Sequence, residues 1–188
     1  MARILTLAGV SGSGKTTLAG MFIERMPNAA MITSYTTRAF RTSDLLGEYA
    51  RISNETYDAM VAEDEFLWTV AHGSPRYGTI ARDIDAVLRK ADGVGIMILV
   101  PDKVPALRDY LATRGALEAH VPVYICSPGE KLIQCRLEHR GDTRERIVER
   151  LALESGWDGK AGVSGVPYVY VRNEGPIEAA YEQVRALI

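Results

Sequence analysis

The 188-residue chain contains little that is typical of secreted, membrane-embedded or nucleic-acid-binding proteins. Its two cysteines, Cys126 and Cys135, are too few for a disulfide framework and lack C-x-x-C spacing, which favours core thiols in a reducing compartment. No apolar run approaches the length of a membrane span, and the first residues do not resemble a secretory signal. The net charge of −2 gives no support for a nucleic-acid partner. We therefore expect a cytoplasmic protein with no membrane or nucleic-acid partner.

The chain does contain an alternation of short apolar runs and longer helical patterns, and its hydrophobic content of 47% allows one domain with a sizeable core. The expected strands are 4–8, 29–33, 95–100, 121–126 and 168–171. The expected helices are 16–26, 55–62, 81–91, 104–112, 130–139, 144–154 and 177–187. Residues 34–78 interrupt the alternation with a polar insert. The pattern predicts an α/β fold, a P-loop three-layer sandwich whose parallel sheet has helices on both faces. The run 95–100 is the best candidate for its central strand.

The most informative stretch runs from Gly9 to Thr16 and fits G-x-x-x-x-G-K-[ST], the phosphate-binding P-loop. A strand-like run precedes it and a helical pattern follows it, which is the context that the motif requires. Glycines let consecutive backbone N–H groups point at an anion, and the helix N-terminus adds partial positive charge. The sequence therefore predicts an ATP site, with Lys15 on the β- and γ-phosphates and the Thr16 hydroxyl on Mg²⁺. Its residues are Gly9, Ser11, Gly12, Ser13, Gly14, Lys15, Thr16 and Thr17.

A second anion site is predicted directly after the second strand. Arg38 and Arg41 stand three residues apart beside the hydroxyls of Ser34–Thr37, so forked guanidinium donors and neutral donors can grip one phosphate. Tyr49 and Tyr77 are further candidate donors. The alternative is a solvated basic loop with ordinary tyrosines. A phosphoryl transferase needs such a second site beside its P-loop, so the pair of sites favours a kinase that acts on a phosphorylated small molecule.

The chain resembles the guanylate kinase family in a series of motifs that covers nearly its whole length. After the P-loop come S-Y-T-T-R, G-E-Y, E-F-L, Y-G-T, C-R-L-E-H-R-G, E-R-L and Y-V-Y-V-R-N, in the same order and with similar spacing. They lie at 34–38, 47–49, 65–67, 77–79, 135–141, 149–151 and 168–173. The resemblance implies a core at 1–33, 81–136 and 157–188, an acceptor-binding subdomain at about 34–80 and a lid at about 137–156.

The resemblance also implies roles for individual residues. Ser34, Arg38, Arg41, Tyr49 and Tyr77 would hold the acceptor phosphate. Arg140 and Arg150 would move from the lid onto the transferring phosphates, which makes them catalytic candidates together with Lys15 and Arg38. Arg136 and Asn173 would bind ATP, with Asn173 near the adenine. The alternative for the three late arginines is surface ion pairing with glutamates at helical spacing, namely Glu138, Glu145 and Glu154.

The predicted base pocket departs from the family pattern. Trp68 stands where a glutamate is expected, and Pro101, followed by Asp102, stands where a second carboxylate is expected. Thr79 keeps the expected hydroxyl. An indole only donates hydrogen bonds, so Trp68 either stacks on a ring or fills space, and it cannot read the donor edge of guanine. We therefore expect an acceptor site that includes Trp68, Thr79 and Asp102 and has poor guanine selectivity.

Two other functions remain open from the sequence. The chain is similar to the ribose 1,5-bisphosphate phosphokinases in Ala71–Gly73, Val104–Pro105 and Arg108, although that group has Asp where this chain has Thr16. A guanylate-kinase-like module that binds phosphopeptides is the alternative without catalysis, but such a module has no use for an intact Gly14-Lys15-Thr16. The first prediction is thus an ATP-dependent and Mg²⁺-dependent kinase for a nucleoside monophosphate, as a monomer or homodimer.

Overall fold

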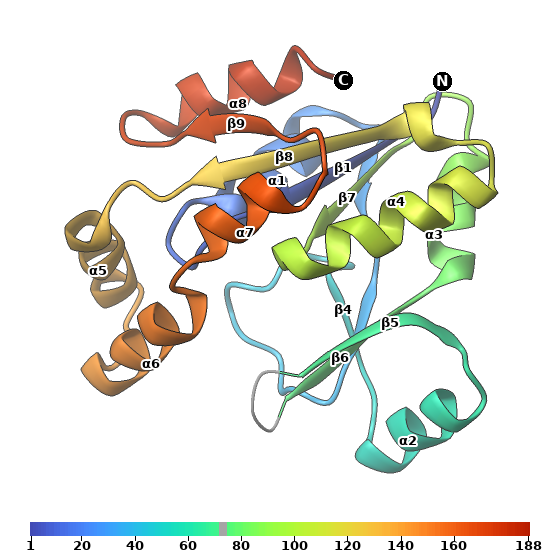
Figure 1. Ribbon diagram of the computed structural model, residues 1–188, viewed down its shortest axis with the longest axis horizontal. Helices are drawn as coiled ribbons and strands as arrows, with labels where there is room; N and C mark the ends of the chain where they lie inside the picture. The colour runs from blue at the N-terminus through green and yellow to red at the C-terminus, as the bar shows by residue number, and fades with distance from the viewer. Residues whose placement is uncertain (72–74) are drawn as a thin grey trace. The chain divides into compact units, whose positions relative to one another are not determined.

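The computed structural model describes residues 1–71 and 75–188 (Figure 1). The chain forms two compact units, each built from three segments. The first unit comprises residues 1–5, 23–97 and 106–120, and the second comprises residues 6–22, 98–105 and 121–188. His72 and Gly73, which belong to the similarity with the bisphosphate kinases, lie outside the described residues.

The larger sheet has the strand order β2-β7-β1-β8-β9. Its strands are β1 (Arg3–Ala8), β2 (Ala29–Met31), β7 (Val94–Ile98), β8 (His120–Cys126) and β9 (Val169–Arg172). β2 pairs with β7 and β8 pairs with β9, both in parallel. This confirms the α/β class with a central parallel sheet. The middle position belongs to β1, and β7, the expected central strand, lies beside it.

The polar insert forms a four-stranded sheet of its own within the first unit, with the order β4-β3-β6-β5. Its strands are β3 (Ser34–Thr36), β4 (Tyr49–Arg51), β5 (Phe66–Ala71) and β6 (Arg76–Ile80). The helix α2 (Asn54–Ala62) starts where the Ser53 hydroxyl accepts a hydrogen bond from the Thr56 amide, a normal N-cap. Its Tyr57 hydroxyl donates to the Tyr77 carbonyl, which ties the helix to β6.

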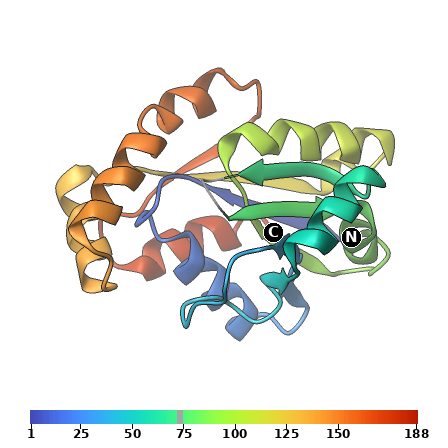
Figure 2. The ribbon, with the colours of Figure 1, turned by 90° about the horizontal axis from the view of Figure 1, so that it is seen from below.

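The other helices, apart from α7, follow the apolar spacing of the sequence closely. They are α1 (Lys15–Arg25), α3 (Ala81–Leu88), α4 (Val104–Thr113), α5 (Glu130–His139), α6 (Arg144–Glu154), α7 (Trp157–Val163) and α8 (Ile177–Arg185), with short 3-10 turns η1 (Pro101–Lys103) and η2 (Leu117–Ala119). α5 and α6 lie side by side in the second unit (Figures 1 and 2). Within the described residues, none of these helices has the length and apolarity to cross a membrane.

Helix α7 was not expected, because Gly159 and Gly162 lower the helix propensity of its sequence. Its position in the second unit explains why it forms. Ala161 is buried, and the Tyr124 hydroxyl donates to the Asp158 carboxylate at 2.7 Å. Burial and this hydrogen bond supply the stability that local propensity lacks.

Candidate active site

The P-loop turns at Gly9 and Gly14, whose φ angles are 136° and 108°. A side chain at Gly9 would collide with the carbonyl oxygen of Ile125, and one at Gly14 would collide with the side-chain amide of Asn173. Only glycine combines this backbone conformation with such close neighbours. The strand–loop–helix context predicted from the sequence is confirmed, with β1 before the loop and α1 directly after it.

Lys15 folds back along the P-loop from the first position of α1. Its Nζ donates to the carbonyl oxygens of Gly9 at 2.6 Å and Val10 at 2.8 Å. Burial lowers the pKa of Lys15 to about 8. The carboxylate of Glu154 opposes this shift in pKa, and the guanidinium groups of Arg140 and Arg150 add to it. These three side chains therefore lie close enough to Lys15 to act on its charge.

Two residues predicted to bind ATP, Arg136 and Asn173, contact the P-loop backbone. The Arg136 guanidinium donates to the Gly12 carbonyl at 3.1 Å and to the Asn173 carbonyl at 2.8 Å. The Asn173 side-chain amide donates to the Ser13 carbonyl at 2.8 Å. Arg136 and Asn173 thus tie the P-loop backbone to α5 and to the segment after β9.

Helix α6 brings a carboxylate and a guanidinium onto the P-loop. Glu154 accepts two hydrogen bonds from Ser11, a short one from the backbone amide and one of 2.6 Å from the hydroxyl. The Arg150 guanidinium also reaches the Ser11 hydroxyl, at 3.4 Å. The alternative for the three late arginines was ion pairing with Glu138, Glu145 and Glu154. Arg136 makes its hydrogen bonds to backbone carbonyls.

An apolar cluster positions helices α5 and α6 against the P-loop. Val10 of the P-loop packs with Ile133 and Leu137 of α5 and Ile147 of α6, and all four are buried. Leu151 and Trp157 cover the cluster. Arg140, at the end of α5, pairs with Asp142 in the turn that follows. Packing thus fixes the helices, while Arg140 keeps part of its side chain exposed.

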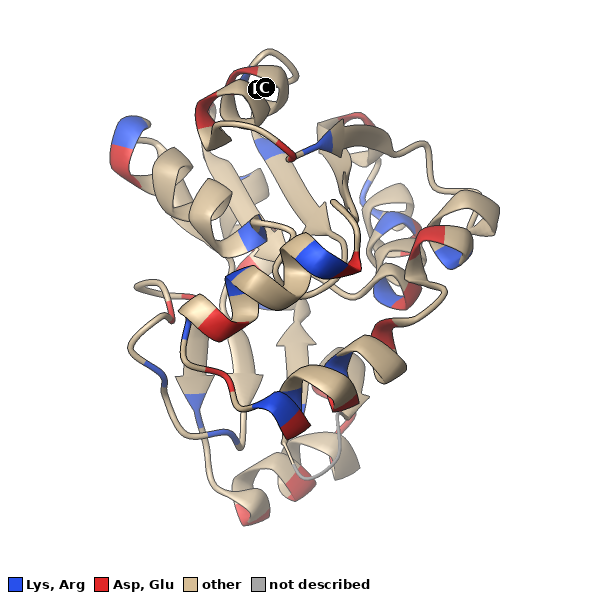
Figure 3. Ribbon diagram, turned by 90° about the vertical axis from the view of Figure 1, so that its left-hand side faces the viewer, with Lys and Arg blue, Asp and Glu red and all other residues tan. Residues whose placement is uncertain are grey.

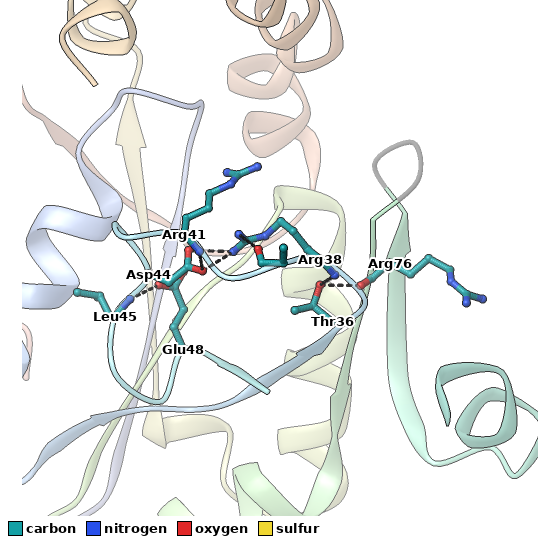
Figure 4. Close-up of polar contacts among 8 residues, drawn as sticks. Thr36, Arg38, Arg41, Asp44, Leu45, Glu48 and Arg76 are labelled. Atoms are coloured by element: carbon teal, nitrogen blue, oxygen red, sulfur yellow. Dashed lines mark hydrogen bonds and ion pairs between the residues drawn. The ribbon is translucent and has the colours of Figure 1, made fainter. Parts of the chain in front are cut away.

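In the first unit, Arg38 is the centre of a buried ion pair. Its guanidinium donates to both carboxylate oxygens of Asp44, at 2.9 and 3.0 Å, and to the Ala39 carbonyl at 2.8 Å (Figure 4). Asp44 also accepts a hydrogen bond from the Arg41 backbone amide at 2.8 Å. The Arg38 amide donates to the Thr36 hydroxyl, which itself donates to the Arg76 carbonyl. The loop after β3 is therefore held by charge at one end and by strand β6 at the other.

The two predicted phenolic donors lie together with Arg38. The rings of Tyr49 and Tyr77 have centroids 6.0 Å apart, and the Arg38 guanidinium lies 4.7 Å from the centroid of Tyr49. Burial and the neighbouring Glu48 carboxylate raise the pKa of Tyr49, so its hydroxyl stays protonated and can donate. Ser34 is the register partner of Tyr49 on the neighbouring strand. The structure thus brings Ser34, Arg38, Tyr49 and Tyr77 into one cluster.

Trp68 lies on β5 directly opposite Thr79 of β6, next to an irregularity of the ladder between Phe66 and Trp68. Its side chain is only 7% exposed, and Thr79 is buried beside it. Asp102 belongs to the second unit, where it pairs with Lys160 at 3.4 Å. Trp68 and Thr79 are therefore neighbours within the first unit. The ion pair of Asp102 with Lys160 lies within the second unit.

Comparison with known proteins identifies the family. The guanylate kinase family model matches residues 1–188, the whole chain. The chain belongs to the guanylate kinase family. A guanylate kinase of Rhodopseudomonas palustris is 28% identical over 186 residues, which cover 98% of this chain and 80% of the relative. One of Anaeromyxobacter dehalogenans is 29% identical over 187 residues, covering 98% and 79%.

The fold of the family is present as well. The crystal structure of a guanylate kinase from Anaplasma phagocytophilum matches with a TM-score of 0.65 and 19% identity, over 99% of this chain and 84% of that one. Acidic and basic residues are interspersed along the helices (Figure 3). The positive charge of both candidate sites comes from local arginines and Lys15.

Two acidic residues of these sites were not predicted as site residues. Asp44 has no motif of its own, and only its position three residues after Arg41 indicates a local contact. Glu154 was considered only as an ion-pair partner for the late arginines. Its spacing of four residues from Arg150 places both on one face of α6, which is the signal that a search for lid residues could have used.

Proposed function

We propose that the chain transfers the γ-phosphoryl group of ATP to a nucleoside monophosphate, with GMP as the first acceptor to test. The observation that carries this proposal is the cluster of Lys15, Arg140 and Arg150 around a P-loop whose Ser11 donors already bind a carboxylate. That carboxylate is a stand-in for an anionic ligand. Family membership and the relatives named guanylate kinase support the choice of ATP and GMP.

The proposed roles follow from the charge that phosphoryl transfer develops. Such a reaction needs positioning and neutralisation of an in-line transition state, and it needs no protein nucleophile. Lys15, Arg140 and Arg150 supply positive charge to the transferring group. Thr16 and the nucleotide phosphates would hold Mg²⁺, which neutralises phosphate charge when bound. The donor set of the loop fits this group, because hard cations prefer oxygen ligands.

In the acceptor subdomain we propose that Ser34, Arg41, Tyr49 and Tyr77 contact the acceptor phosphate. Arg38 contributes its charge, while its hydrogen bonds to Asp44 and Ala39 keep the loop ordered. Both rings are held against one another and against Arg38, so little side-chain entropy is lost on binding.

Trp68 and Thr79 mark the base end of this proposed site. Trp68 cannot accept hydrogen bonds from the N1 and N2 positions of guanine, and Thr79, which carries a hydroxyl, is its register partner on β6. We infer that discrimination between GMP and AMP is weaker than a carboxylate pocket would give. The acceptor-binding role of Asp102 stays a prediction, and its observed ion pair is with Lys160.

The internal division also belongs to the proposal: core at 1–33, 81–136 and 157–188, acceptor-binding subdomain at about 34–80, lid at about 137–156. The cytoplasmic location and the choice between monomer and homodimer stay predictions. The phosphopeptide-binding alternative is disfavoured because the P-loop, Lys15 and the lid arginines are all present and clustered.

The test is ADP formation from MgATP with GMP, dGMP, AMP and ribose 1,5-bisphosphate offered separately. We expect turnover with GMP and dGMP, and a loss of about 10²–10³-fold or more in Lys15→Ala, because one preorganised cation at the transferring group is removed. Lys90→Ala, which removes an exposed lysine in the first unit, is the control and should retain activity. If ribose 1,5-bisphosphate is the only compound phosphorylated, it is the acceptor in place of a nucleoside monophosphate. If none of the four compounds is phosphorylated, the proposed kinase activity is refuted.

A further inference from the structure

Glu154 occupies donors of the P-loop that an incoming phosphate would also use. Its two carboxylate oxygens accept from the amide and the hydroxyl of Ser11, and Ser11 lies between the first two glycines of the motif. Hydrogen bonds from an amide and a hydroxyl to a carboxylate are charge-assisted and therefore stronger than neutral ones. The loop thus holds an anion that is supplied by the chain itself.

The surroundings of this carboxylate are positively charged. Arg150 reaches the same Ser11 hydroxyl, and Lys15 and Arg140 lie close enough for their charges to interact. Lys15 meanwhile donates to the carbonyls of Gly9 and Val10. In this arrangement, Ser11 bonds to Glu154 and Lys15 bonds to its own loop.

Packing delivers Glu154 to this position. Ile147 and Leu151 of α6, and Trp157 of α7, pack on the cluster that includes Val10, the residue next to Ser11. Glu154 is the last residue of α6, so the packing of this helix places its side chain at the loop. A change in the packing of α6 against Val10 would withdraw the carboxylate and Arg150 together.

We propose that Glu154 is an intramolecular competitor for the phosphate chain of the donor nucleotide, and that the donor displaces its carboxylate from Ser11. This rests on the proposed function in one respect, namely that the P-loop binds a polyphosphate. A phosphate that takes the Ser11 donors repels the carboxylate, while it attracts Arg150 and Lys15. Exchange of the two anions therefore separates Glu154 from the loop and leaves the arginine in place.

Population arithmetic converts an assumed occupancy of Ser11 by the carboxylate into a change in Kd. If the carboxylate occupies Ser11 in nine of every ten molecules, about a tenth of the protein is competent, and the apparent Kd for the donor is about tenfold higher than the intrinsic one. A tenfold change corresponds to about 1.4 kcal/mol. Removing the charge of Glu154 should recover this factor.

The experiment measures Kd by isothermal titration calorimetry for MgATP and, separately, for inorganic tripolyphosphate, which lacks base and ribose. The variants are Glu154→Gln, which keeps the size and removes the charge, and Glu154→Ala, which removes the contact. Glu149→Gln is the matched control, because Glu149 is an exposed glutamate of the same helix. ADP formation with GMP is recorded in parallel.

We expect both Glu154 variants to bind MgATP and tripolyphosphate about tenfold more tightly, and Glu149→Gln to bind like the wild type. Unchanged or weaker binding in Glu154→Gln would overturn the proposal, and so would an equal gain in Glu149→Gln. Tighter binding by the Glu154 variants, together with no phosphoryl transfer by the wild type, would support the competitor role and refute the kinase function. The two failures are therefore distinguishable.

Discussion

Replacing Asp44 by asparagine tests whether a buried ion pair holds together the loop after β3, which we propose binds the acceptor. Asp44 accepts hydrogen bonds from both the Arg38 guanidinium and the Arg41 backbone amide. The side chains of Arg38 and Asp44 are only 8% and 13% exposed, so water screens their attraction little. Asp44→Asn keeps one oxygen acceptor but leaves the guanidinium without its counter-charge.

The expected loss of stability is about 2–4 kcal/mol. Breaking a buried ion pair by removing one partner costs about 3–5 kcal/mol, and the remaining amide oxygen of asparagine recovers part of this. For a protein of this length, a change of 1 kcal/mol shifts Tm by about 2–4 °C. The melting temperature should therefore fall by roughly 4–16 °C.

The chain offers a control in the same subdomain. Asp58 pairs with Arg76, but its side chain is 66% exposed. Exposed ion pairs contribute about 0–1 kcal/mol, so Asp58→Asn should leave Tm almost unchanged. Thermal unfolding followed by circular dichroism and by calorimetry measures both variants. The steady-state KM for GMP should also rise in Asp44→Asn, while the KM for ATP stays near the wild-type value.

Equal Tm values for Asp44→Asn and the wild type would refute the reasoning, because the pair would then contribute no net stability. An equal loss in Asp58→Asn would also contradict it, because burial would then make no difference between the two pairs. A rise in the KM for ATP that equals the rise for GMP would show that the effect is not confined to the acceptor loop.

Two further predictions concern the base pocket and pH. Trp68→Glu should raise the preference for GMP over AMP by about tenfold, because a carboxylate accepts hydrogen bonds from N1 and N2 of guanine. Trp68→Gln, the uncharged counterpart, should raise this preference less. An unchanged ratio of the kcat/KM values for GMP and AMP would show that Trp68 lies away from the base. Burial, together with the Arg108 charge at 3.5 Å, lowers the pKa of His120 to about 3. In the unfolded chain His120 has a pKa near 6.5, so as the pH falls the unfolded state takes up the proton before the folded state does. The free energy of unfolding therefore falls as the pH drops from about 6.5 toward 3, by about 2 kcal/mol at pH 5. His120→Gln should lose about that much less between pH 7 and pH 5 in urea unfolding, and an equal loss in both proteins would contradict the assignment.

Local patterns predicted most of the elements because their causes lie within a few residues. The apolar spacing of Leu18, Met21 and Phe22 predicted α1, and all three are buried. The glycines of the P-loop predicted its turn, and their φ angles show why no other residue fits. Residues 34–78 were recognised as an insert because they break the alternation, and they form the separate four-stranded sheet.

The composition and motifs thus determined the α/β class, the P-loop and the family. The tertiary structure decided that β1 takes the middle of the sheet, that α7 forms despite its glycines, and that Arg38 pairs with Asp44. It also placed Glu154 on Ser11, 143 residues away in the chain. The physical reason is the range of the interactions: propensity and spacing act within a few turns, whereas a carboxylate reaches a distant amide only when an apolar cluster has first packed the two segments together.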